Sequence, residues 1–352
     1  MIGLRGIFDN YNSYGILGTE IADGLIKAGL PIRCIAAIDP DYRDSDWNRT
    51  ENPKLHDYWA DPSEKLEKEL VILPPDTACL QNSQIARRRV HFTMFESPRL
   101  CPSWITFENS CEAVIVPCEG NLIAFNSCGV NAQLFKVPLG YNPENTYYSP
   151  MNMQGPCVFG IGGRIHKVTD FRKGAERAVE LFKRAFPGEE NVLLDVKTLS
   201  CDEPCVNEHD SRVKLTRSFI APEQMHEWYS GLTCYLSLSC SEGWGLMQFE
   251  AMVSGRPIIS TNYMGVREFF IPENGYEIKG RYVRANVWPN SFEPGVWCEP
   301  EAEDVVKAMR RVYADRAEAE RKGLASSKHV RGYTWSNTVE QIIDVLKRLE
   351  WV

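Results

Sequence analysis

Residues 239–257 read SCSEGWGLMQFEAMVSGRP and are the most informative stretch of the chain. The pattern predicts that a strand over 234–238 ends in a serine-rich turn, and that two glycines then lead into a helix over 246–253. Free backbone amides and the positive end of the dipole at such a helix start suit a phosphate group. Glycines in the turn let a ligand approach the backbone closely. The stretch therefore predicts an anion-binding turn after a strand.

Two acidic residues flank this helix start. Glu242 lies in the turn, and Glu250 follows eight residues later, about one turn into the helix. Two carboxylates beside a phosphate seat are electrostatically unfavourable unless each accepts hydrogen bonds from hydroxyl groups. Sugar and ribose hydroxyls are donors of that kind, so the pair favours a nucleotide sugar as ligand. The less specific alternative is a capped helix with a solvated glutamate.

Outward from this stretch, apolar runs of strand length alternate with helical patterns in both halves of the chain. Strands are expected over 2–8, 32–38, 70–73, 90–95, 113–117, 134–138, 158–161, 192–196, 234–238 and 258–260. Strands that are apolar nearly throughout and separated by helices predict parallel sheets covered on both faces. The expected fold class is therefore α/β, with two Rossmann-like doubly wound domains whose ligands bind at the carboxyl ends of the strands.

Composition supports two globular domains. The chain has 352 residues, of which 43% are hydrophobic and 24% charged, and a segment rich in Pro, Asn and Gly over 141–156 is the expected linker. The domains are predicted to span 1–150 and 151–330. Formal net charge is −8, and residues 1–150 carry 13 basic and 19 acidic side chains, a net of −6. This charge does not favour a polyanionic partner.

Three further features predict a cytoplasmic protein without a metal site. No run of about 18 apolar residues indicates a transmembrane segment, and the start of the chain resembles a strand more than a signal peptide. Twelve cysteines are scattered, mostly in apolar runs, as in reduced proteins. Cys201, Cys205 and His209 have a spacing that a metal could use, but the usual two-by-two ligand set is missing.

The Glu242-x7-Glu250 pair, with the tail EAMVSGRPII over 250–259, resembles the signature of the GT-B glycosyltransferases, nearest the large retaining family 4. The resemblance extends over nearly the whole chain. It implies two facing domains with a crevice between them, the first on the acceptor side and the second binding the nucleotide sugar, and a last helix within 331–352 that crosses back to the first domain. It also implies that Glu242 contacts the transferred sugar and Glu250 the ribose.

Residues 160–174 read GIGGRIHKVTDFRKG and resemble the Gly-Arg…Lys-Gly segment of the same family. Arg164 follows a strand and Lys173 begins the next helix. Two cations with helix amides can stabilise the charge that develops on a diphosphate leaving group. The resemblance therefore implies a reaction without a divalent metal or other cofactor, with the nucleotide diphosphate sugar as co-substrate. Arg172 competes with Lys173 for the role, and the alternative is that these are surface cations.

In the first half, residues 92–104 read FTMFESPRLCPSW and resemble a motif in one branch of the family. Glu96 stands there where many relatives have a crevice histidine. It is a candidate to receive the proton of the acceptor hydroxyl or to hydrogen-bond the sugar, and the alternative is an ion pair with Arg99. His91, at the start of the strand, is assigned a structural role.

The loop over 10–18, NYNSYGILG, joins the first strand to the first helix. It lacks the G-x-G-x-x-G fingerprint, which argues against an NAD-dependent oxidoreductase. Relatives use a loop of small residues here to approach the donor phosphates. The expected catalytic residues are Arg164, Lys173, Glu242 and Glu96, and the expected donor-binding residues are Gly15, Gly163, Gly243, Trp244, Gly245, Leu246 and Glu250.

The function implied by the resemblance is retaining, metal-independent transfer of a hexose from a UDP- or GDP-sugar to a hydroxyl of an acceptor. The acceptor stays open among a glycan, a protein, a small molecule and a hydroxymethylated DNA base. The DNA alternative rests on the basic run Arg87–Arg89 and is disfavoured by the acidic first half. A noncatalytic GT-B-like protein that binds sugar nucleotides is the alternative function, and donor turnover would separate the two.

Overall fold

The computed structural model describes residues 1–9, 12–37, 53–60, 66–163, 165, 170–198, 209–285 and 295–352. The described residues form two compact units. The first comprises Met1–Gly140, Gly295 and Tyr333–Val352, and the second comprises Tyr141–Ala285 and Val296–Gly332. The first division along the chain thus falls ten residues before the expected one after residue 150.

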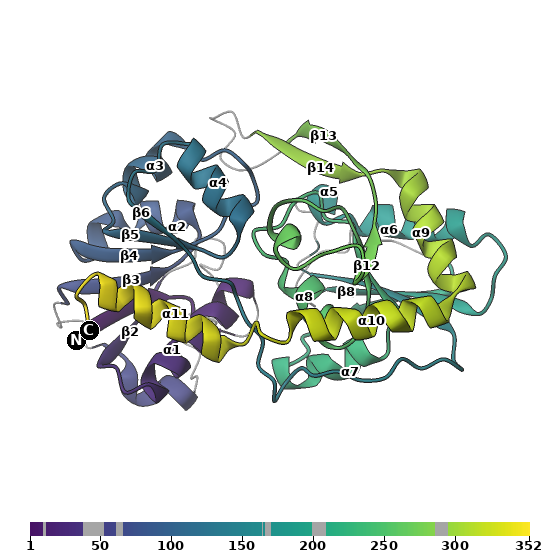
Figure 1. The fold of residues 1–352 in the computed structure, drawn as a ribbon, viewed down its shortest axis with the longest axis horizontal. Coiled ribbons are helices and arrows are strands. Elements are labelled where there is room, and N and C mark those ends of the chain that lie inside the picture. Colours follow the sequence, from purple (N-terminus) through teal and green to yellow (C-terminus); the bar gives the residue numbers. More distant parts are fainter. Residues whose placement is uncertain are drawn as a thin grey trace. The chain divides into compact units, whose positions relative to one another are not determined.

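The first unit is built on a parallel sheet with the strand order β2-β1-β3-β4-β5-β6 (Figure 1). Its strands are β1 (Ile2–Gly6), β2 (Ile32–Ala36), β3 (Lys68–Ile72), β4 (Arg88–Phe92), β5 (Ala113–Val116) and β6 (Gln133–Lys136). Its helices are α1 (Ser13–Lys27), α2 (Pro75–Leu80), α3 (Pro102–Glu108), α4 (Glu119–Ser127) and α11 (Trp335–Arg348), with short 3₁₀ turns η3 (Pro53–Tyr58) and η4 (Asn82–Gln84). Side chains of α2, α3 and α4 pack on one face of the sheet.

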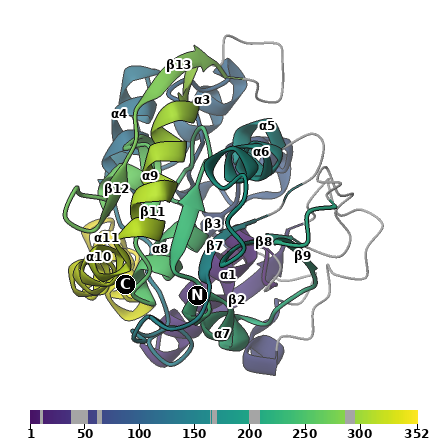
Figure 2. The same cartoon turned by 90° about the vertical axis from the view of Figure 1, so that its right-hand side faces the viewer.

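The second unit repeats this design with the order β12-β11-β10-β7-β8-β9 (Figure 2). Its strands are β7 (Cys157–Gly162), β8 (Val192–Thr198), β9 (Val213–Arg217), β10 (Cys234–Ser237), β11 (Ile258–Ser260) and β12 (Gly275–Glu277). Its helices are α5 (Asp170–Lys173), α6 (Ala175–Ala185), α7 (Met225–Ser230), α8 (Leu246–Val253), α9 (Ala302–Ala314) and α10 (Arg316–Val330), with turns η5 (Pro222–Gln224) and η6 (Met264–Glu268). The antiparallel strands β13 (Gly280–Arg284) and β14 (Val296–Pro300) form a separate ribbon.

Every strand expected from the apolar runs is present in one of the two parallel sheets, so the α/β prediction is confirmed. Several expected strands extend past the observed end, because buried residues such as Phe8 and Met94 continue the apolar pattern after the chain leaves the sheet. Helix α8 has the predicted bounds. Among the described residues, no helix has both the length and the apolar character needed to cross a membrane.

The segment over 141–156 packs into the second unit around a buried cation. Arg256 is fully buried, and its guanidinium donates hydrogen bonds to Ser149 Oγ at 2.9 Å, Tyr229 O at 3.0 Å and Ser230 O at 2.9 Å. Burial lowers the pKa of Arg256 to about 10. Because Arg256 supplies several donors in a fixed geometry, it joins this segment to α7 and to the end of α8.

Helix α11 packs against α1 within the first unit, as the yellow and purple ribbons show in Figure 1. A Cβ at Gly24 would lie 2.4 Å from Val339 Cγ2, so the absence of a side chain permits the close approach of the two helices. Thr338 Oγ1 also donates to Pro138 O at 2.8 Å. The carboxyl-terminal helix is therefore an integral part of the first unit.

Candidate functional site

The expected anion-binding turn brings Lys173 and Glu242 together. Lys173 Nζ lies 2.7 Å from Glu242 Oε1 and 3.0 Å from Oε2, although 69 residues separate them in sequence. Arg172 Nη1 lies 3.3 Å from Glu242 Oε2 and donates to Ser241 O at 3.0 Å. The short helix α5 thus delivers two neighbouring cations to one carboxylate.

Glu242 stays ionised in this surrounding. Its side chain is 8% exposed. Burial, the largest influence, acts to raise its pKa, but Lys173 and Arg172 together with hydrogen bonds from Lys173 and Ser239 lower the pKa to about 2. Three charged side chains are thus gathered at the turn before α8, with the carboxylate kept ionised by its two cationic neighbours.

Glycines with positive φ place the backbone around this cluster. Gly174 has φ +77° directly after Lys173, and a Cβ there would lie 2.8 Å from Leu238 O. Gly245 has φ +98° and is the N-cap residue of α8, so that the first amides of this helix follow the turn. Gly265 N donates to Glu242 O at 2.9 Å, and a Cβ on Gly265 would lie 2.6 Å from Gly243 C. These approaches need glycine.

The end of β7 is fixed from the neighbouring strand. Tyr235 Oη accepts a hydrogen bond from Gly162 N at 3.2 Å and donates to Gly162 O at 2.9 Å. The next residue, Gly163, has φ +147°, and a Cβ there would lie 3.9 Å from Lys173 Cε. Gly163 is therefore adjacent to Lys173.

Glu250 lies on α8 and is oriented by a buried tyrosine. Tyr229 Oη donates to Glu250 Oε2 at 2.8 Å, and Tyr229 is fully buried. Burial, and to a lesser extent the charge of Glu250, raises the pKa of Tyr229 well above its ordinary value. The Tyr229 hydroxyl therefore keeps its proton and acts as a hydrogen-bond donor. The carboxylate of Glu250 is thereby held in one orientation beside the helix start.

Three of the donor-binding candidates, Trp244, Gly15 and Leu246, are buried. The Trp244 side chain is 1% exposed and packs against Phe249 and Phe269, at ring-centroid distances of 5.4 and 5.2 Å. Only its backbone can therefore contact a ligand. Gly15 N donates to Asn12 Oδ1 at 2.8 Å as part of the N-cap of α1. Leu246, the first residue of α8, is 8% exposed.

Glycine is required at position 15 by packing within the first unit. A Cβ there would lie 2.1 Å from Asp9 Oδ1 and 2.6 Å from Asp9 O. Asp9 is 8% exposed, and its Oδ1 accepts from Asn12 N at 3.3 Å. The close approach therefore serves the connection between β1 and α1.

The remaining catalytic candidates are Glu96 and Arg164. Glu96 follows β4 and is partly buried, and its charge helps to raise the pKa of Tyr14, after the larger effect of burial. Tyr14 Oη donates to Met94 O at 3.0 Å, so Tyr14 and the segment that carries Glu96 are neighbours in the first unit. Arg164 lies outside the described residues.

Several basic and titratable residues have structural partners. His91 is fully buried between Glu108 Oε2 at 2.8 Å and Leu73 O at 3.0 Å, in agreement with its predicted structural role. Arg88 binds Glu112 at 2.6 Å, and Arg89 Nη1 donates to Asn82 Oδ1 at 2.6 Å. These contacts account for two residues of the basic run within the unit itself.

The possible metal ligands Cys201 and Cys205 lie outside the described residues, and the part of the chain that the structure describes contains no group of three or more metal-ligating side chains.

Four residues near the candidate site were either not predicted from the sequence or predicted only as an alternative. They are Arg172, Gln248, Tyr229 and Tyr235. Arg172 had a signal, because it precedes Lys173. Gln248, Tyr229 and Tyr235 had none, because their partners are distant or depend on helix orientation.

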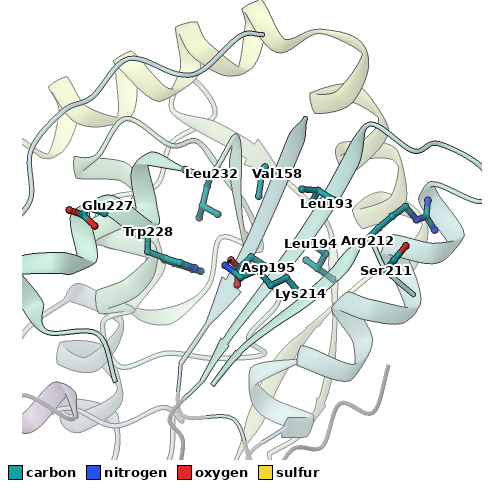
Figure 3. A pocket seen from close by; sticks show the side chains of 11 residues that line it. Val158, Leu193, Leu194, Asp195, Ser211, Arg212, Lys214, Glu227, Trp228 and Leu232 are labelled. Atoms are coloured by element: carbon teal, nitrogen blue, oxygen red, sulfur yellow. Dashed lines mark ion pairs between the residues drawn. The ribbon is translucent and has the colours of Figure 1, made fainter. Parts of the chain in front are cut away.

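A pocket of about 540 Å³ lies elsewhere on the second unit (Figure 3). It is lined by Val158, Leu193, Leu194, Asp195, Ser211, Arg212, Lys214, Glu227, Trp228, Gly231 and Leu232. Val158 and Leu193 lie near the amino ends of β7 and β8, whereas Gly163 and Lys173 follow the carboxyl end of β7. No residue of the predicted site lines this pocket, so it is separate from the cation cluster.

A family model described as "Family 4 Glycosyltransferase in conflict systems" matches residues 165–342, about half of the chain. The chain belongs to the family 4 glycosyltransferases. The family prediction from the Glu-x7-Glu and Lys-Gly segments is thereby confirmed. A D-inositol 3-phosphate glycosyltransferase from Nocardioides sp. is 22% identical over 129 residues, which are 37% of this chain and 24% of that relative. The matched stretch thus spans about a quarter of the relative.

Solved structures resemble the whole chain. Sucrose-phosphate synthase from Thermosynechococcus elongatus has a TM-score of 0.69 at 16% identity, covering 99% of this chain and 98% of that one. HepE from Anabaena, solved in complex with UDP and glucose, has a TM-score of 0.65 at 13% identity and covers 99% and 100%. WaaG, involved in lipopolysaccharide biosynthesis, has a TM-score of 0.62 at 13% identity, covering 98% and 99%. These likenesses confirm the predicted GT-B fold.

Proposed function

We propose that this family 4 member is a retaining hexosyltransferase that moves a sugar from a nucleotide diphosphate sugar to a hydroxyl group of an acceptor. The observation that carries the proposal is the cluster of Lys173, Arg172 and Glu242 beside the glycine-capped start of α8. A diphosphate leaving group gains negative charge as the glycosidic bond breaks. Fixed cations and helix amides stabilise that charge without reorganising at the moment of reaction.

Each predicted site residue named below from the second unit has a distinct role in this proposal. Lys173 and Arg164 bind the donor phosphates, with Gly163, Gly243, Gly245 and the first amides of α8 allowing close approach. Glu250, oriented by Tyr229, accepts hydrogen bonds from the ribose hydroxyls. Glu242 binds a hydroxyl of the transferred sugar. The acceptor oxygen attacks the anomeric carbon on the face from which the nucleoside diphosphate departs. The bond between the anomeric carbon and the diphosphate oxygen breaks as the new glycosidic bond forms, and the departing oxygen can accept the acceptor's proton.

The first unit is proposed to hold the acceptor, with Glu96 as a hydrogen-bond partner of the acceptor hydroxyl or of the sugar. A carboxylate can take this proton only if it is ionised and within hydrogen-bond reach. Glu96→Gln keeps the shape and removes the charge. If Glu96 is the base, this variant should lose most of its transfer activity while donor binding stays unchanged. If Glu96 only contacts the sugar, transfer activity and donor binding should both fall by a smaller amount.

The donor proposed for the first experiments is a UDP-sugar. HepE was solved with UDP and glucose, and TarM was solved in a complex that includes UDP. These ligands belong to those proteins, and GDP-sugars remain the second choice for this chain. Acceptor classes still open are glycans, proteins, small molecules and, with least support, a hydroxymethylated DNA base.

Donor turnover is the deciding measurement. A panel of UDP-, GDP- and ADP-hexoses, scored by mass spectrometry for release of the free sugar, should show hydrolysis of at least one donor even without an acceptor. Binding of a nucleotide sugar with no turnover in the presence of acceptor mixtures would instead support the noncatalytic binding protein. Absence of binding as well would contradict both proposals.

Activity should also survive chelation of divalent metals. The proposed leaving-group charges are neutralised by side-chain cations and amides, so excess EDTA should leave turnover within about twofold of the untreated rate. Loss of turnover in EDTA that is restored by added manganese or magnesium would contradict a metal-independent reaction.

A further inference from the structure

The carboxylate oxygens of Glu242 already accept hydrogen bonds from other side chains of the protein. Its Oε1 accepts from Lys173 Nζ at 2.7 Å and Gln248 Nε2 at 3.4 Å, and its Oε2 accepts from Lys173 Nζ at 3.0 Å and Arg172 Nη1 at 3.3 Å. An ionised carboxylate has about four lone-pair positions. A sugar hydroxyl can therefore bind Glu242 only after one of these donors has moved away.

Arg172 is the donor best placed to move from the carboxylate to a phosphate. Its Nη1 is shared between Glu242 and Ser241 O, and its own backbone oxygen accepts from Cys240 N at 2.8 Å. The backbone contact anchors the residue to the turn while the guanidinium remains partly accessible, with 16% of the side chain exposed. A guanidinium group can bind a phosphate with two parallel hydrogen bonds from two of its nitrogens. The contact of Arg172 with Glu242 is made through Nη1.

The three side chains of the cluster are largely buried. Lys173, Arg172 and Glu242 are each at most 20% exposed. A phosphate that reaches them therefore meets their charges with little screening by solvent.

We propose that Arg172 is a second phosphate-binding residue, and that binding of the donor diphosphate transfers Arg172 from Glu242 to the phosphate and so frees the carboxylate for the sugar hydroxyl. This inference rests on the proposed function, because it assumes a nucleotide diphosphate ligand at this turn. Glu242 and the diphosphate then compete for the same cation. Donor binding and the preparation of Glu242 become one coupled step.

Isothermal titration calorimetry with UDP and GDP, and for comparison with uridine and guanosine, tests the role of Arg172. Arg172→Gln should weaken binding of the diphosphate that wild type prefers by about tenfold and leave the nucleoside unchanged, since a charge-assisted hydrogen bond is lost. Lys214→Gln is the control. Lys214 is 71% exposed and pairs with Asp195 at 3.3 Å away from the turn, so its loss should change diphosphate affinity by no more than about twofold.

Glu242→Gln tests the exchange itself. With the competing negative charge removed, the affinity for the same diphosphate should rise by about tenfold, again without change for the nucleoside. Unchanged or weaker diphosphate binding would overturn the exchange. If this variant does not fold, Arg172→Lys decides, because it keeps the charge but not the fork of donors. The exchange predicts an affinity between those of wild type and Arg172→Gln, and equal affinity in all three proteins would overturn it.

The results separate the inference from the proposed function. If wild type binds UDP or GDP and Arg172→Gln binds it equally well, the inference alone fails. If wild type binds none of the nucleoside diphosphates, the proposed nucleotide-sugar site fails together with the inference.

Discussion

Lys173, Arg172 and Glu242 form a largely buried charge cluster that contributes to stability and, in the proposed function, to ligand binding. Burial alone favours the neutral form of Glu242, and the nearby cations keep it charged. Removal of Glu242 takes away the carboxylate that both cations contact, which is more destabilising than the loss of an exposed ion pair. In the proposed function, the same arrangement keeps two cations in place for an anionic ligand.

Glu242→Gln should reduce stability in a pH-dependent way. The pKa of Glu242 is about 2 in the folded protein, against an ordinary value of 4.5. A lowered pKa contributes stability that is fully present above pH 4.5 and is lost as the pH falls towards 2, here about 3 kcal/mol. Urea titrations of both proteins from pH 7 to pH 2.5 should therefore show a difference that is largest above pH 5 and shrinks in acid. A difference that does not vary with pH would contradict this assignment.

Lys173→Ala should lower donor turnover by about two to three orders of magnitude, the usual effect of losing a donor that stabilises developing charge. Affinity for the nucleoside diphosphate should fall as well, because the diphosphate is charged before the reaction. Lys214→Ala provides the control, since Lys214 is 71% exposed and pairs with Asp195 at 3.3 Å on another part of the second unit. Full activity of Lys173→Ala in a steady-state assay would remove Lys173 from the site.

Among the elements, the junction of α5 and α6 is the most constrained. Gly174 is the N-cap residue of α6 with φ +77°, and it follows the two cations directly. A side chain there would meet the backbone oxygen of Leu238 on the segment after β10. Helix α5, the turn after β10 and the start of α6 therefore depend on one another. The position of Lys173 is a property of this junction as much as of its own rotamer.

Gly174→Ala should destabilise the protein by about 1–3 kcal/mol, because alanine is strained at this φ and its Cβ would collide with Leu238 O. The affinity for nucleoside diphosphates should fall as well, since Lys173 would shift. Gly188→Ala is the control, because no atom lies within 4 Å of a Cβ at that position and its φ is not in the left-handed region. Equal denaturation midpoints for the two variants would show that the junction tolerates a side chain.

At the scale of the whole molecule, the first unit combines residues 1–140 with residues 333–352, and the second unit lies between them in sequence. Trp351 Nε1 donates to Glu112 Oε2 at 2.8 Å, and Lys68 Nζ donates to Trp351 O at 3.3 Å. The guanidinium of Arg88 lies 5.8 Å from the centre of the Trp351 ring. The last residues thus join β3, β4 and the start of β5, which are more than 230 residues earlier in sequence. Such long-range contacts tie the stability of the first unit to the end of the chain.

Trp351→Ala should destabilise the first unit by about 3 kcal/mol, through the lost burial of the indole ring and the lost hydrogen bond to Glu112. Hydrogen–deuterium exchange should therefore accelerate in β3, β4 and β5, with β7, β8 and β10 unaffected. Val352→Ala is the control, since Val352 is 49% exposed. Uniform acceleration over both units would show that they unfold together.

The sequence by itself determined the α/β class, most strand positions, the bounds of α8 and the family, because these depend on local periodicity and on residues close together along the chain. It did not reveal the edge strands β9 and β12 or the ribbon β13–β14, which are short or partly exposed and lack a continuous apolar run. Only the tertiary structure decided which side chains meet. It buried the Trp244 ring in the core, placed Tyr229 against Glu250, and brought Arg172 and Lys173 to one carboxylate. Contacts between residues about 20 to 70 positions apart depend on how strands and helices pack, and local pattern carries no information about that packing.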